Sequence, residues 1–117
     1  MQIQVHTDNH IDGGVGLTRQ VEAIVESAME RFGDRITRVE VHFTDENGRQ
    51  KSGDSDKRCV MEARLAGLQP ITVSAEGSSL EQALDGAADK LQKTLKRTLG
   101  RLDDPKGRTS YAGNETT

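Results

Sequence analysis

Aromatic residues and long apolar runs are scarce in this sequence. The 117 residues include no tryptophan, one tyrosine and two phenylalanines, so we expect a core built from aliphatic side chains and methionine. No run of about 18 apolar residues exists, and the N-terminus lacks the basic-then-apolar pattern of a secretory signal. These absences predict a soluble, cytoplasmic protein without a membrane partner, and the length predicts one domain.

Residues for catalysis or for metal and phosphate binding are equally few. The single cysteine, Cys59, can form no intramolecular disulfide and no cysteine-based zinc cluster. His6 and His42 could approach each other on adjacent strands, but two histidines without a third ligand make a poor metal site. Segment 8–16 is rich in glycine but lacks the Gly-Lys-Ser/Thr of a phosphate loop, so we interpret it as a flexible connection. With no paired nucleophile and base, we predict no enzymatic activity, no metal, no cofactor and no small-molecule substrate.

Positive charge is low overall but concentrated in one segment. The formal net charge is -3, which by itself argues against a nucleic-acid partner. Residues 1–89 hold 9 lysines and arginines against 16 acids, and residues 102–117 hold 2 against 3. Residues 90–101 hold five cations and no acid. These cations are Lys90, Lys93, Lys96, Arg97 and Arg101. This asymmetry is the first indication of function.

Hydrophobic periodicity predicts four strands and two helices. Alternation of apolar and polar residues indicates strands near 2–6, 36–44, 59–65 and 71–75. A helix that ends near Gly33 precedes the second strand. Its apolar face consists of Val21, Ile24, Val25, Ala28, Met29 and Phe32. Segment 45–58 is mostly charged or small residues, and we expect a long, mobile turn there.

A second, longer helix is predicted after the fourth strand. Ser78 and Glu81 have the spacing of a capping box, which would open this helix. Its predicted apolar face consists of Leu80, Leu84, Ala87, Ala88, Leu91, Leu95 and Leu102. From Asp103 onward the chain has no aliphatic residue larger than alanine, so we expect a domain over 1–102 and a disordered tail over 103–117.

The order strand, helix, strand, strand, strand, helix predicts an α+β fold in two layers. A helical crossover between the first two strands makes them parallel neighbours. Both helices would then cover one face of a four-stranded sheet. The other face would be polar, suited to water or to a hydrophilic partner. Its residues would be Gln4, His6, Arg38, Glu40, His42, Glu62, Arg64, Thr72 and Ser74.

The cations of the second helix are expected to form a stripe. At about 100° per residue, Lys90, Lys93, Arg97 and Arg101 cluster along one flank, with Glu81, Asp85 and Asp89 on the opposite flank. Cations one turn apart on a rigid element can meet successive phosphates of a nucleic-acid backbone. Arg19 would extend this patch if the two helices lie side by side. The alternative explanation is that cations near a helix C-terminus only complement the helix dipole.

The last third of the sequence resembles a known family. Segment 73–97 is similar to the end of the domain found in ribosome hibernation-promoting factors and ribosome-associated inhibitors. The matching motifs are Ala75-Glu76-Gly77, Ala83-Leu84-Asp85 and Asp89-Lys90-Leu91. The segment Asp34-Arg35-Ile36 also resembles the junction between the first helix and second strand of that family.

This resemblance implies both a fold and a function. The fold is similar to double-stranded-RNA-binding folds. The function would be that of a monomeric, short-form factor of the sigma-54 modulation protein type. Such a factor binds the small ribosomal subunit in the channel used by messenger and transfer RNA, and it silences idle ribosomes under stress. The residues expected to contact 16S-type rRNA are Arg19, Lys90, Lys93, Lys96, Arg97 and Arg101.

The first helix departs from the family pattern. Typical members are rich in lysine and arginine on both helices, whereas Glu22, Glu26 and Glu30 follow one another here at i+4 spacing. The alternative function is a divergent, non-enzymatic protein-interaction module on the same fold. It would use the acidic first helix or the polar sheet face to regulate a partner protein.

Overall fold

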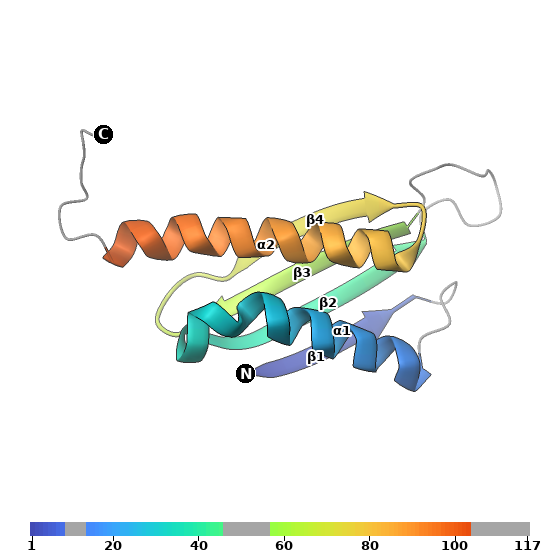
Figure 1. Ribbon diagram of the computed structural model, residues 1–117, viewed down its shortest axis with the longest axis horizontal. Helices are drawn as coiled ribbons and strands as arrows, with labels where there is room; N and C mark the ends of the chain where they lie inside the picture. Colours follow the sequence, from blue (N-terminus) through green and yellow to red (C-terminus); the bar gives the residue numbers. More distant parts are fainter. Residues whose placement is uncertain (9–13, 46–56, 104–117) are drawn as a thin grey trace.

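A computed structural model describes residues 1–8, 14–45 and 57–103, and its elements follow the predicted order (Figure 1). The elements are β1 (Gln2–Thr7), α1 (Gly14–Met29), the 3-10 segment η1 (Glu30–Arg35), β2 (Ile36–Asp45), β3 (Lys57–Leu65), β4 (Ile71–Gly77) and α2 (Leu80–Asp103). None of the helices in the described ranges is both long and apolar enough to span a membrane. The predicted α+β fold is confirmed.

The four strands form one mixed sheet in the order β1-β2-β3-β4. β1 pairs in parallel with β2, while the β2–β3 and β3–β4 pairs are antiparallel. Figure 1 shows both helices on the same face, α1 over β1 and β2 and α2 over β3 and β4. Each helix runs back along the strand that precedes it, so α1 and α2 point in the same direction.

The core lies between the sheet and the two helices. Alternate residues of β2 and β3, such as Val41, Phe43 and Met61, are fully buried because successive strand residues point to opposite faces. Leu91 and Leu95 of α2 are also fully buried. The core is therefore mostly aliphatic, as expected.

The predicted helix faces are largely those observed. The buried residues of α1 and η1 are Val21, Val25, Met29 and Phe32, while Ile24 and Ala28 are half-buried against the core. The buried face of α2 also includes Ala83 and Leu99, which the periodicity did not select. The side chain of Leu102 lies outside the described residues.

The first helix begins earlier than the sequence predicts. Gly14 and Gly16, which we assigned to a flexible connection, belong to the first turn of α1. Gly14 has a φ of 83°, a conformation that glycine adopts without strain. Leu17 packs against the core, and this contact outweighs the low helix propensity of the glycines.

Replacing Gly16 by alanine is expected to stabilise the protein. Gly16 is exposed inside the helix, and a Cβ built there meets no atom within 4 Å. Alanine restricts the unfolded chain and favours the helix, so the free energy of unfolding should rise by about 0.5–1 kcal/mol. Urea denaturation measures this change. A matched Gly14→Ala variant should instead lose stability, because its φ is positive.

Two further boundaries differ from the sequence prediction. Asp45 and Lys57, which we placed in a mobile turn, pair as the last rungs of the β2–β3 ladder, and their side chains lie 3.5 Å apart. Arg58 is likewise in β3. The rest of the predicted turn, residues 46–56, lies outside the described residues. α2 includes Asp103, and the predicted tail from residue 104 onward is also outside the described residues.

The N-terminus of α2 is capped one residue later than predicted. The Ser79 hydroxyl accepts a hydrogen bond from the Gln82 backbone N–H at 3.1 Å. The Gln82 side-chain oxygen accepts bonds from the Ser78 backbone N–H and hydroxyl, at 2.9 and 2.7 Å. The capping pair is therefore Ser79 and Gln82 rather than Ser78 and Glu81.

Cys59 is expected to resist thiol reagents in the folded protein. Its side chain is fully buried, and desolvation by burial raises the pKa of the thiol to about 12. Since only the thiolate reacts, labelling by a disulfide reagent at pH 8 should be at least about 100-fold slower than in denaturant. Labelling at the same rate in both conditions would contradict the burial of this side chain.

Candidate functional site

The C-terminal half of α2 presents a cluster of exposed cations, which we call the cationic cluster. It consists of Lys93, Lys96, Arg97 and Arg101, which surround Gly100. Together these five residues line an open surface hollow of about 500 Å³. Gly100 has no side chain, so it leaves a gap between neighbours that lie one residue, one turn or two turns away along α2. The hollow is open to solvent.

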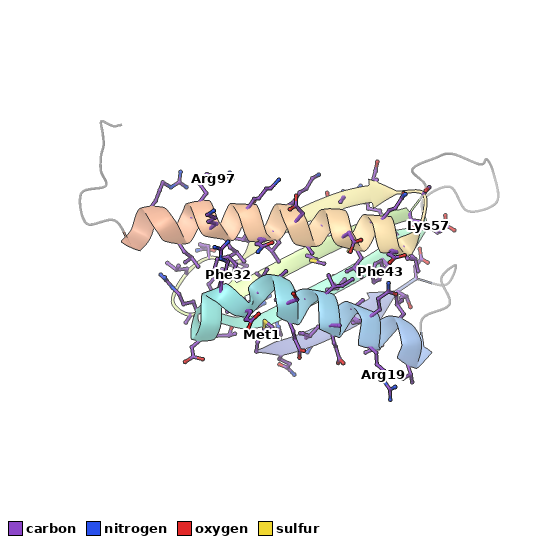
Figure 2. All side chains as sticks on the ribbon, in the orientation of Figure 1. Met1, Arg19, Phe32, Phe43, Lys57 and Arg97 are labelled. Atoms are coloured by element: carbon purple, nitrogen blue, oxygen red, sulfur yellow. The ribbon has the colours of Figure 1, made fainter. Side chains whose placement is uncertain are left out.

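Lys90 has a different role from the rest of the predicted stripe. Its ammonium donates a 2.8 Å hydrogen bond to the backbone carbonyl of Ser74 in β4. This contact turns the Lys90 flank of α2 toward the edge strand β4. Arg97 and Arg101 follow Lys90 by seven and eleven residues, so they share that flank. Figure 2 shows Arg97 on the side of α2 away from α1.

The predicted separation of charges around α2 is wrong at one position. Asp89 was placed on the flank opposite Lys93, but their side chains form a 3.1 Å ion pair. Residues four apart lie on the same face of a helix, which explains the contact. The described structure gives no ion-pair partner to Lys96, Arg97 or Arg101 within residues 1–8, 14–45 and 57–103.

The structure does not bring Arg19 to the cationic cluster. The two helices do lie side by side, but they point in the same direction. Arg19 is in the first turns of α1 and Arg97 is in the last turns of α2, so Figure 2 places them at opposite ends of the molecule. β1 and β4, which precede the two helices, point in the same direction, so both helices start at the same end of the molecule.

Sequence reasoning missed two residues near the cationic cluster. Gly100 forms the gap between the cations. The sequence indicates this position, because residues three and four apart, such as Arg97 or Lys96 and Gly100, lie on the same face of a helix. Arg35 of η1 lines a second hollow, of about 280 Å³, together with Leu99 of α2. Arg35 therefore comes close to the C-terminal half of α2. Arg35 belongs to the Asp34-Arg35-Ile36 segment, which supports the family resemblance and was not predicted as part of the site.

The open face of the sheet is polar, as predicted. Glu40 of β2 contacts Arg38 at 2.8 Å, and Glu62 of β3 contacts Arg64 at 3.6 Å. His42 is about half-exposed on the same face. This face lies on the other side of the sheet from α2, so it is separate from the cationic cluster.

A comparison with family models identifies a match over nearly the whole described chain. The model described as sigma 54 modulation protein / S30EA ribosomal protein matches residues 4–103. The chain belongs to this family. The resemblance drawn from segment 73–97 is thereby confirmed. The description of the family names a modulation protein and a ribosomal protein, and it names no enzyme.

Two solved structures are similar to this member of the family. The N-terminal domain of Protein Y from Thermus thermophilus has 21% sequence identity and a TM-score of 0.66, over 84% of this chain and 99% of that one. A ribosomal subunit interface protein from Coxiella burnetii has 19% identity and a TM-score of 0.63, over 86% of this chain and 99% of that one. At these identities the likeness establishes a shared fold. Among curated proteins, no sequence matches this chain.

The Ala-Glu-Gly motif of this family member has a structural explanation. Ala75 and Gly77 are buried at the end of β4, and Glu76 between them is exposed. A Cβ at Gly77 would lie 2.7 Å from the Gln82 Cβ and 2.9 Å from the Ala83 backbone nitrogen. Only glycine therefore allows the first turn of α2 to pack this closely on β4. The motif sets the start of the helix that carries the cationic cluster.

Proposed function

We propose that this protein is a ribosome-associated translation inhibitor that binds the small ribosomal subunit through the cationic cluster of α2. In this proposal, Lys93, Lys96, Arg97 and Arg101 contact phosphates of 16S-type rRNA in the channel used by messenger and transfer RNA. Bound there as a monomer, the domain would block translation by occupying the channel. It would act in the cytoplasm under stress, without a cofactor or small-molecule substrate.

Family membership supports the partner in this proposal. The family description includes a ribosomal protein, and the Coxiella relative is titled a ribosomal subunit interface protein. The observation that carries the choice of surface is the exposure of four cations around one hollow. Such a surface can displace counterions from several neighbouring phosphates at once.

The helix dipole does not account for these cations. The favourable effect of a cation at a helix C-terminus falls off within the last turn. α2 ends at Asp103, so Arg101 lies in the last turn, while Lys96 and Lys93 lie about two and three turns from the end, respectively. Dipole complementation thus accounts for Arg101, whereas binding to rRNA would account for the exposed cations farther from the helix end.

Co-sedimentation with small ribosomal subunits over a range of salt concentrations tests this proposal. If about four phosphates are contacted, the logarithm of the binding constant should fall with the logarithm of salt concentration with a slope of about -3. Large ribosomal subunits provide the control for unspecific RNA binding and should bind much more weakly. Absence of binding to small subunits at low salt would contradict the proposal.

The acidic flank of α1 favours one alternative function. Glu26 of α1 and Glu30, the first residue of η1, are exposed, and within the described ranges neither has an ion-pair partner. A protein-interaction module using this flank would bind a basic protein partner. It would not bind ribosomal subunits, so the same co-sedimentation experiment separates the two functions.

A further inference from the structure

Three potential metal ligands meet on the open face of the sheet. His6 of β1 and His42 of β2 are paired in the parallel register, and their rings stack with centroids 4.5 Å apart at an angle of 13°. Glu40 lies two residues before His42, so it points to the same face of β2. The two histidines alone predict no metal site, and Glu40 supplies the third ligand group that was not identified from the sequence.

The side-chain atoms of this triad converge. The Glu40 Oε1 atom lies 3.5 Å from His42 Nε2 and 4.0 Å from His6 Nε2. One ligand atom from each of the three side chains lies within 4.8 Å of the other two. Ligand atoms around a tetrahedral zinc ion, at about 2.0–2.1 Å from the metal, are roughly 3.3 Å apart. Because the rings are stacked, metal binding requires the two imidazoles to rotate until their nitrogens point at one ion, and the strands can stay in place.

Neighbouring groups orient the carboxylate and leave the site open. Arg38 holds the other carboxylate oxygen, Oε2, at 2.8 Å, so Oε1 remains directed at the histidines. Hydrogen-bonded partners of this kind fix the orientation of metal ligands. Glu40 is 17% exposed, while His6 and His42 are 48% and 46% exposed. A metal ion can thus enter from solvent and keep water molecules as its remaining ligands.

We propose that His6, Glu40 and His42 bind a divalent transition-metal ion, with zinc as the representative ion. Two imidazoles and one carboxylate form a donor set that suits zinc and related divalent metals. The ion would join the edge strand β1 to β2 at one rung of the sheet. Bound metal should therefore raise the melting temperature of the protein. The site lies on the sheet face away from α2 and does not depend on ribosome binding.

Metal titration of untagged, metal-free protein tests this proposal. Zinc chloride added in a calorimeter should bind with a stoichiometry of one ion per chain. Cobalt(II) should give visible absorption bands of a nitrogen- and oxygen-ligated ion, and zinc should displace them. In His6→Ala and in His42→Ala the affinity for zinc should fall by about tenfold or more. Unchanged affinity in these variants, or no zinc binding by the parent protein, would overturn the proposal.

Two more variants assign the carboxylate and control for histidine content. Glu40→Gln keeps the size of the side chain and should also lose about tenfold or more in zinc affinity. His10, which lies outside the described residues, provides the matched control, and His10→Ala should bind zinc like the parent. A loss in His10→Ala equal to that in His42→Ala would contradict the three-residue site. Circular dichroism confirms that each variant is folded.

Discussion

Reversing two charges of the cationic cluster, Arg97→Glu with Arg101→Glu, is expected to lower the affinity for small ribosomal subunits by about 100-fold at low salt. Both arginines are exposed. Figure 2 shows Arg97 on the side of α2 away from α1, and Arg101, four residues later, shares that flank. Each substitution removes a phosphate contact and adds a repulsive charge. The slope of the logarithm of binding against the logarithm of salt concentration should become shallower by about 2.

A matched variant separates this local effect from the net charge of the protein. Arg19→Glu with Arg31→Glu also replaces two exposed arginines by glutamates, on α1 and η1. Both double variants change the net charge by the same amount, and neither alters a buried side chain. We expect the affinity of the control variant to stay within about threefold of the parent. Equal losses in the two variants would contradict the assignment of the site to α2.

The fold could be predicted from the sequence because the protein has one core and simple periodicity. Val39, Val41 and Phe43 alternate with polar residues, and their burial fixes which face of β2 points to the core, because a slip of one residue would expose all three. The start of α1 could not be predicted in the same way. Local propensity disfavours helix at Gly14 and Gly16, and only the packing of Leu17 in three dimensions reverses that preference.

The candidate site could be predicted in part. The cations of 90–101 are visible as a run in the sequence, but their different roles are not. Lys90 contacts β4 and Lys93 contacts Asp89, and these contacts depend on how α2 sits on the sheet. The prediction for Arg19 required the relative direction of the two helices, which follows from topology and not from local sequence. His6, Glu40 and His42 were all predicted on the polar sheet face, but the register between β1 and β2, which brings the Glu40 carboxylate within 4.0 Å of His6, was not predicted.

Gly77→Ala is expected to be the most destabilising of the glycine substitutions considered. The new Cβ would lie 2.7 Å from the Gln82 Cβ and 2.9 Å from the backbone nitrogen of Ala83. Neither atom is the free end of a flexible side chain, so the first turn of α2 must move away from β4. That movement would disturb the hydrogen bonds of the Ser79 and Gln82 cap. The free energy of unfolding should fall by about 1–3 kcal/mol, measured by urea denaturation.

The comparison with Gly16→Ala isolates the cause of this loss. Both variants add one methyl group to a glycine with negative or extended φ, but only Gly77 has atoms within 4 Å of the added Cβ. If Gly16→Ala raises the free energy of unfolding and Gly77→Ala lowers it, the loss in Gly77→Ala is caused by the close packing of α2 on β4. An unchanged urea midpoint in Gly77→Ala would contradict that packing.

The junction between β4 and α2 also positions the helix that carries the cationic cluster. Gly77→Ala should therefore weaken binding to small ribosomal subunits without changing the charge of the protein.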